Sequence, residues 1–470
     1  MSNSFLKIFI IDCCLVWGLV GSSCKKLVEV DSPVTNPTEE TAYKSNSTAT
    51  AVLTGIYIRM IQGSAMSSGT ESISFLSGLS ADELNNYSTI PVFGQFYKNA
   101  VNKSNIPFWS ESYRYIYTAN AALEGLSSSN TITPEVKQQL MGEAYFIRAF
   151  FYFYLVNLFG DVPLQLTTDY KETSSASRKP KADVYKQIIG DLKQAQSLLR
   201  DDYLGADNKQ TTERARPNKG AANALLARVY LYTRDFPNAE ATSTLVINNT
   251  ANYEIEPELD NVFLKNSREA IWQLAPVNPQ YNTFDGYFFI LTTAPGLIRP
   301  VALSPLVVSS MEEGDKRKEK WIGALTESGQ NYYFPLKYKI GELDQPVSEY
   351  LMVLRIAEQY LIRAEARNEL GDVGGAQGDL NIVRARAGLE NTTASDKSSL
   401  IIAIEKERRS ELFTEWGHRW LDLKRTGRVD QIMAIVTSQK GGIWNTNMQW
   451  YPVPINEIQS NPNITQNLGY

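Results

Sequence analysis

The segment from Gly142 to Leu164 constrains the fold of this chain more than any other. It reads GEAYFIRAFFYFYLVNLFGDVPL, and its aromatic residues fall on every side of a helix: Tyr145, Phe146, Phe150, Phe151, Tyr152, Phe153, Tyr154 and Phe159. A helix that is apolar all round is buried in a core. Gly160 and Pro163 then end it, because glycine closes helices and proline cannot continue them. The sequence therefore predicts a buried central helix.

Helical periodicity recurs along the chain. Apolar spacing and capping residues predict helices over 39–62, 109–126, 134–159, 182–200, 217–233, 237–248, 350–370, 375–387 and 398–415. Two long stretches between them, 64–108 and 251–349, lack this periodicity and are rich in Gly, Pro, Asn and aromatic residues. Loops this long in a compact protein are usually functional.

The helices also repeat as pairs. Ala227, Asp235 and Ala239 recur in the same order and spacing as Ala364, Asp372 and Ala376. This is typical of tetratricopeptide-like antiparallel helix pairs of about 34 residues. The helices at 109 and 134 make a third pair, and those at 39 and 182 a fourth by packing across the chain. We expect a mainly α fold of about four such pairs with a loop-rich, irregular second region.

The central segment resembles the SusD/RagB family of bacterial surface nutrient-binding lipoproteins. Three further segments carry the same resemblance, namely LIRAEARNELGD onward from Leu361 to Gly388, ERRSELFTEWGHRWLDLKRTG from Glu407 to Gly427, and WYPVPINEIQSNPNITQNLGY from Trp450 to Tyr470. The resemblance implies a SusD-like fold and a single domain over 39–470. It also implies a ligand site among loops of the two aperiodic regions.

The net charge of the chain limits its possible partners. The net charge of −5 argues against a nucleic-acid partner, because phosphate binding needs a basic surface.

Cys13, Cys14 and Cys24 all lie at the start of the chain. Residues 1–23 have the layout of a lipoprotein signal peptide, Cys24 would be the lipidated residue, and 24–38 a polar tether. An ordinary secretory signal cut nearby is the alternative. The resemblance implies the outer membrane, facing outward.

Catalytic and metal-binding signals are missing from the sequence. His418 is the only histidine, so a zinc site of the usual kind has too few ligands and a Ser-His-Asp triad would have to use this residue alone. We interpret His418 as structural. No two acidic residues stand out as the pair that glycoside hydrolysis requires. The sequence predicts no catalytic residue, no metal and no cofactor.

The aromatic residues of the two long regions are the candidate ligand-binding residues. A sugar presents a face of C–H groups rimmed by hydroxyls, so it needs an aromatic platform beside polar side chains. The favoured residues are Asn86, Tyr87, Phe93, Tyr97, Tyr281, Tyr287, Arg299 and Trp321, from a wider set that includes Tyr332 and Tyr333. Trp321 is the first choice because it follows the solvated run from Asp315 to Lys320. The alternative is that these rings pin the loops to the core.

Together these observations predict a non-enzymatic, lipid-anchored protein that binds a glycan or its oligosaccharides at the cell surface. By resemblance it would work with a SusC-like TonB-dependent transporter in nutrient uptake. A peptide ligand is the alternative within the family. A helical-repeat scaffold that binds only proteins would leave the aromatic loops unexplained, and a helical glycoside hydrolase would need two carboxylates facing each other in a cleft.

Overall fold

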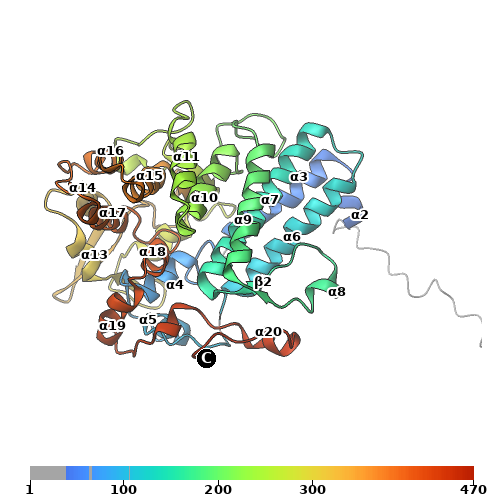
Figure 1. Ribbon diagram of the computed structural model, residues 1–470. Coiled ribbons are helices and arrows are strands. Elements are labelled where there is room, and N and C mark those ends of the chain that lie inside the picture. Colours follow the sequence, from blue (N-terminus) through green and yellow to red (C-terminus); the bar gives the residue numbers. More distant parts are fainter. Residues whose placement is uncertain (1–38, 63–65, 105) are drawn as a thin grey trace, which may run out of the picture.

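A computed structural model describes residues 39–62, 66–104 and 106–470, and helices dominate it (Figure 1). The longer helices are α3 (Asn46–Ile61), α6 (Phe108–Ser128), α7 (Pro134–Phe159), α9 (Lys181–Leu198), α10 (Lys219–Tyr232), α11 (Phe236–Ile247), α15 (Ile356–Leu370), α16 (Val373–Arg386), α17 (Lys397–Glu411) and α19 (Val429–Gln439). The predicted mainly α fold class is confirmed.

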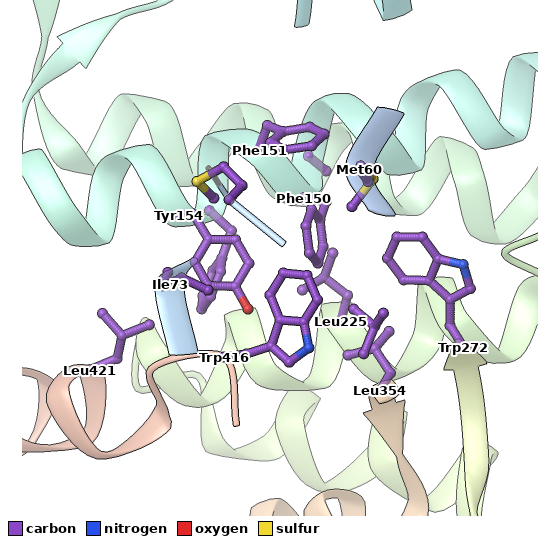
Figure 2. Close-up of a cluster of buried hydrophobic side chains, with 14 of the residues drawn as sticks. Met60, Ile73, Phe150, Phe151, Tyr154, Leu225, Trp272, Leu354, Trp416 and Leu421 are labelled. Atoms are coloured by element: carbon purple, nitrogen blue, oxygen red, sulfur yellow. The ribbon is translucent and has the colours of Figure 1, made fainter. Parts of the chain in front are cut away.

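Helix α7 lies at the centre of the core, as its aromatic content predicts. Every side chain from Phe146 to Phe159 is buried. Figure 2 shows Phe150 between two tryptophans from distant segments, with its ring centroid 5.4 Å from that of Trp272 and 5.5 Å from that of Trp416. The helix ends at Gly160, whose φ of +78° is one that glycine adopts without the penalty of a side chain. Buried rings on all sides of α7 thus tie helices and strands to one core.

Three of the expected helix pairs are present. Helices α6 and α7, α10 and α11, and α15 and α16 each pack together, and α11 also packs against α15, so the pairs follow one another in a row (Figure 1). The two helices expected to form a fourth pair do not pack against each other in that way. Helix α3 lies against α6 and α7, whereas α9 lies against α7 and α10.

The two regions expected to be irregular contain short elements. The first holds α4 (Ile73–Ser80), β1 (Leu84–Asn86) and α5 (Pro91–Tyr97), and the second holds β4 (Ala270–Leu274), α12 (Phe284–Phe289), β5 (Val301–Leu303), α13 (Pro305–Ser310), α14 (Lys316–Lys320), β6 (Ile322–Glu327) and β7 (Gln330–Pro335). The helix expected from residue 350 begins only at Ile356. The preceding residues form β8 (Leu351–Arg355), which is buried throughout and pairs antiparallel with β4.

Short elements complete the chain. They are α2 (Glu39–Ala42), β2 (Val162–Pro163), α8 (Tyr170–Thr173), β3 (Arg178–Lys179), α18 (His418–Arg425) and α20 (Ile455–Ser460). Residues near the C-terminus return to the end of α7. The backbone N–H of Tyr451 donates to the carbonyl of Leu158 at 2.8 Å, and the side-chain amide of Asn467 donates to the carbonyl of Phe159 at 2.8 Å. These two bonds satisfy carbonyls that a helix end leaves without partners.

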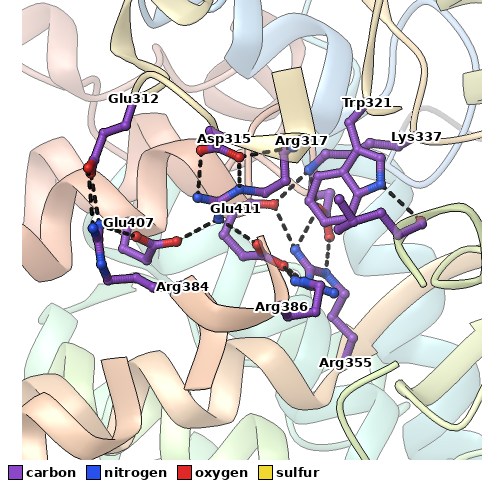
Figure 3. A network of polar contacts seen from close by, with 12 residues as sticks. Glu312, Asp315, Arg317, Trp321, Lys337, Arg355, Arg384, Arg386, Glu407 and Glu411 are labelled. Atoms are coloured by element: carbon purple, nitrogen blue, oxygen red, sulfur yellow. Dashed lines mark hydrogen bonds and ion pairs between the residues drawn. The ribbon is translucent and has the colours of Figure 1, made fainter. Parts of the chain in front are cut away.

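A buried network of charges joins the second region to the C-terminal helices (Figure 3). Arg355, at the end of β8, donates to Glu269 at 2.8 Å, to Glu411 at 2.5 Å and to Glu415 at 2.8 Å. Arg386 of α16 pairs with the same Glu269 and Glu411. Because each charge has partners of opposite sign, the group can be buried without leaving an unpaired ion.

Candidate ligand-binding surface

Strand pairing brings the two long regions together. Strand β1 of the first region pairs antiparallel with β5 of the second, with Asn86 opposite Val301. The pairing continues one residue further, where the N–H of Tyr87 donates to the carbonyl of Pro300 at 2.8 Å. Strand β5 also packs against β7, which forms a hairpin with β6. Residues far apart in the sequence therefore share one surface.

Tyrosines stand at this junction. Tyr87 is 40% exposed, and its ring meets that of Tyr332 on β7 edge to face, at 5.6 Å and 75°. The hydroxyl of half-buried Tyr97 donates to Oδ1 of Asn85 at 3.3 Å. We call Asn85, Tyr87, Tyr97 and Tyr332 the tyrosine surface. Burial, and then Tyr332, raise the pKa of Tyr87, so its hydroxyl carries a proton to donate at neutral pH.

Asn86 has a local role. Its Nδ2 donates to the carbonyl of Ser88 at 3.1 Å, and its Oδ1 accepts the Ser88 N–H at 3.0 Å. A side-chain amide that bonds to the backbone two residues on is typical of a turn. Asn86 thus shapes the turn that presents Tyr87.

A second aromatic group surrounds α12. The half-buried ring of Tyr281 stacks on Phe284 at 4.6 Å and meets Tyr287 at 5.1 Å and 90°. Arg299 lies over Tyr287, with its guanidinium 5.4 Å from the ring centroid. Tyr287, Arg299 and the exposed Thr292 line a surface hollow of about 440 Å³. Arg299, which lines this hollow, directly precedes Pro300, whose carbonyl accepts the N–H of Tyr87.

Arg299 braces the wall of this hollow. Its Nε donates to the carbonyl of Tyr287 at 2.8 Å, its Nη1 to Oγ1 of Thr292 at 2.6 Å and its Nη2 to the carbonyl of Gly341 at 2.6 Å. Each nitrogen of the guanidinium already has a protein acceptor. The side chain therefore fixes the loop.

Two family models match this chain. One, described as starch-binding and associating with the outer membrane, matches residues 30–231, and the SusD family model matches residues 319–470. The chain belongs to the SusD/RagB family. Among its relatives, SusD-like protein P2 of Formosa agariphila is 27% identical, over 77% of this chain and 79% of that protein. SusD-like protein P25 of the same organism is 25% identical, over 100% of this chain and 99% of that protein.

Solved structures of SusD-like proteins share the fold. A SusD superfamily protein from Bacteroides vulgatus matches with a TM-score of 0.80 at 20% identity, covering 92% of this chain and 100% of that one. A laminarin-binding SusD-like protein matches with a TM-score of 0.74 at 29% identity, covering 91% of this chain and 100% of that one. The SusD-like fold inferred from the four sequence segments is confirmed.

The prediction that Trp321 is an exposed platform in this SusD-like protein is wrong. Its side chain is fully buried, and its indole N–H donates to the carbonyl of Leu259 at 3.1 Å. The ring lies against the charge network of Figure 3, with Lys337 Nζ 5.0 Å and the Arg386 guanidinium 5.1 Å from its centroid. The run from Asp315 to Lys320 is not fully solvated either: it forms the short helix α14, and Asp315 and Arg317 are buried in the same network. Trp321 follows as the C-cap of that helix.

Phe93 is a second correction. It is only 4% exposed, and its ring packs against Phe75 of α4 at 5.2 Å. The ring therefore holds α5 to the core, as the alternative interpretation of the loop aromatics has it. Trp109 is buried as well, at 1% exposed, in agreement with an inward-facing position at the start of α6.

Tyr332 was not among the favoured residues, although it belonged to the wider aromatic set. The signal for it was the turn at Ser328 and Gly329 between two runs of strand-forming residues, which predicts a hairpin. A hairpin would have placed Tyr332 beside another strand. It would not have identified Tyr87 as the neighbouring ring.

The remaining titratable candidates are enclosed. Burial lowers the pKa of His418 to about 4, so the imidazole is neutral at pH 7. Burial, followed by Asp82, raises the pKa of Glu83 to about 7, and burial followed by Glu415 does the same for Asp285. Glu83 is 1% exposed and Asp285 6% exposed, so neither carboxyl faces a ligand on the surface.

Three further predictions concern metals and membranes. Within residues 39–62, 66–104 and 106–470, no His, Cys, Asp and Glu side chains gather in a group of three or more that could hold a metal ion. The helices of these residues include none long and apolar enough to cross a membrane. Cys24, the expected lipidation site, and the tether lie outside the described residues.

Proposed function

We propose that this protein binds a glycan on the tyrosine surface and does not cleave it. The observation that carries the proposal is the pair of exposed Tyr87 and half-buried Tyr332, formed where the two long regions meet. A pyranose ring can stack its C–H face on one phenol ring, while its hydroxyls bond to the neighbouring amide and phenol groups. The likeness to a laminarin-binding protein at 29% identity supports a carbohydrate ligand.

We further propose that the protein is anchored by Cys24 at the outer membrane and delivers its ligand to a SusC-like TonB-dependent transporter. The family description of outer-membrane association supports this location. In such an arrangement the protein would be a lid on the transporter. The glycan must then bind better to the closed lid than to the open one, because only a difference in affinity can drive closure.

Substitution of the two tyrosines tests the surface. Binding to soluble polysaccharides, laminarin included, is screened by native affinity electrophoresis and measured by calorimetry. Tyr87→Ala and Tyr332→Ala should each raise the dissociation constant roughly 2- to 12-fold, which corresponds to about 0.5–1.5 kcal/mol for an aromatic contact. The melting temperature should change little for Tyr87→Ala because that ring is already partly in water.

Tyr117→Ala is the matched control. Tyr117 is 53% exposed on α6, on the helical part of the protein. Its loss should leave binding unchanged. Binding that survives both tyrosine substitutions would place the ligand elsewhere, and reducing ends released from the bound polysaccharide would show that the protein is an enzyme.

A further inference from the structure

The polar groups of the tyrosine surface are uncharged. Asn85 contributes an amide, and Tyr87, Tyr97 and Tyr332 contribute phenol hydroxyls. Thr292, at the neighbouring hollow, adds an aliphatic hydroxyl. These groups exchange hydrogen bonds with sugar hydroxyls in both directions, as donors and as acceptors. None of them carries the positive charge that a carboxylate or sulfate needs for strong binding.

Two cations close to this surface, Arg299 and Lys440, donate to acceptors within the protein. All three nitrogens of Arg299 donate to oxygens of the loop. Lys440 Nζ lies 4.9 Å from the centroid of the Tyr97 ring, but it donates to the carbonyls of Leu79 and Ala81. Burial lowers the pKa of Lys440 to about 7, which weakens its charge further at neutral pH. Moving either side chain out towards a ligand would break these internal hydrogen bonds.

The aromatic rings themselves discriminate against anions. The face of a phenol ring carries the negative part of its quadrupole, which attracts cations and repels negative charge. A uronate or sulfated sugar stacked on Tyr87 or Tyr332 would bring its anionic group towards such a face. The side chain of Glu327, whose carboxylate accepts the N–H of Ala294 beside the hollow, adds negative charge to this side of the protein.

We propose that the ligand of this surface is a neutral glycan and that uronic-acid and sulfated glycans are excluded. This inference rests on the proposed function. A neutral ligand makes no ion pairs, so its affinity should be nearly independent of ionic strength. Selection against anionic polysaccharides would then come from the surface itself, without a specific contact to each sugar.

The experiment is a binding screen with probes of both kinds. Laminarin, soluble starch and galactomannan represent neutral glycans, and polygalacturonate, alginate and chondroitin sulfate represent anionic ones. We expect binding only in the neutral set, with a dissociation constant that changes less than about twofold between 20 and 500 mM NaCl. Lys98→Gln, which removes the exposed lysine next to Tyr97, should leave that binding unchanged.

The outcomes separate this inference from the proposed function. Binding of an anionic probe that is lost in Tyr87→Ala would overturn the inference and leave glycan binding by the tyrosine surface standing. Neutral binding that persists in both Tyr87→Ala and Tyr332→Ala would remove the surface as the site, and the inference with it. A screen without any bound probe would count against both.

Discussion

Asp82 and Glu83 are adjacent buried carboxyls with opposite acid–base behaviour. Burial alone would raise the pKa of Asp82, but Arg419, at 2.7 and 2.9 Å, and then Arg409, at 2.8 Å, outweigh it and lower the pKa to about 2. The carboxyl of Glu83 accepts the N–H of Thr414 at 3.2 Å, and its pKa rises to about 7. The number of charged partners decides the sign of each shift.

Glu83→Gln should change how stability depends on pH. Because the pKa of Glu83 is about 7 in the folded protein and near 4.5 when unfolded, the folded state binds more protons between these values. The free energy of unfolding therefore falls as pH rises through this window, by up to ~3 kcal/mol for a shift of this size. The variant should match the wild type at pH 4.5 and exceed it at pH 8, as measured by urea denaturation.

Asp82→Asn should change the free energy of unfolding in the opposite direction from Glu83→Gln. The depressed pKa of Asp82 contributes stability above about pH 4, and this contribution is lost as pH falls through 2. Removing the charge leaves Arg409 and Arg419 without their partner, so we expect a loss of ~3–5 kcal/mol at neutral pH. If both variants moved stability in the same direction at pH 8, the assignment of the two carboxyls would be wrong.

At the scale of elements, close packing sets what a helix tolerates. Gly125 lies inside α6 where the ring of buried Tyr43 crosses it, and an added Cβ would come within 2.1 Å of that ring. Gly190 lies inside α9 with no atom within 4 Å of the same position. The two glycines are therefore a matched pair that differ in their neighbours.

Alanine at these two positions should have opposite effects. Glycine to alanine in an open helix position raises stability by about 0.5–1 kcal/mol, which we expect for Gly190→Ala. Gly125→Ala should instead lower it by ~1–3 kcal/mol, because Tyr43 must move to make room. Thermal unfolding followed by circular dichroism measures both, and a stabilised Gly125→Ala protein would mean that α6 and Tyr43 do not pack as described.

The elements that the sequence predicted well are those with local signals. Helix α7 has the predicted bounds because Pro134, the aromatic run and Gly160 all act within its own length. The start of α15 was misplaced because Leu351–Leu354 are apolar, and a short apolar run does not distinguish a buried strand from a helix. Helix α18, in the segment around His418, was not predicted, because its eight residues are too few for a clear periodic pattern.

The tyrosine surface could not be predicted from local sequence patterns. Tyr87 and Tyr332 meet only because β1 pairs with β5 and β5 packs against β7. Composition indicated the two regions that supply the surface, but core and surface rings share the same sequence signal. Phe93 and Trp321 were chosen on that signal, and both belong to the core.

At the scale of the whole molecule, the proposed attachment to a membrane can be tested at Cys24. Replacing Cys24 with Ala removes the only proposed acylation site, while the described residues, which begin at Glu39, keep all their contacts. We expect the variant to fold with an unchanged melting temperature and to move from the membrane fraction to the soluble fraction, because acyl chains supply the anchoring energy. Fractionation in cells that lack a partner transporter makes the measurement. Retention of the variant in the outer membrane there would contradict the anchor.

The bonds from Tyr451 and Asn467 to the end of α7 also govern when folding can finish. Asn467 and Phe159 are 308 positions apart, so most of the chain separates the end of α7 from one of its hydrogen-bond donors. Until the C-terminal segment has docked, the carbonyl of Leu158 lacks the N–H of Tyr451, and that of Phe159 keeps the Nη2 of Arg178, at 3.4 Å. Native structure around this aromatic-rich helix is thus completed by the last part of the chain, and a chain that has not reached that stage exposes apolar surface that favours aggregation.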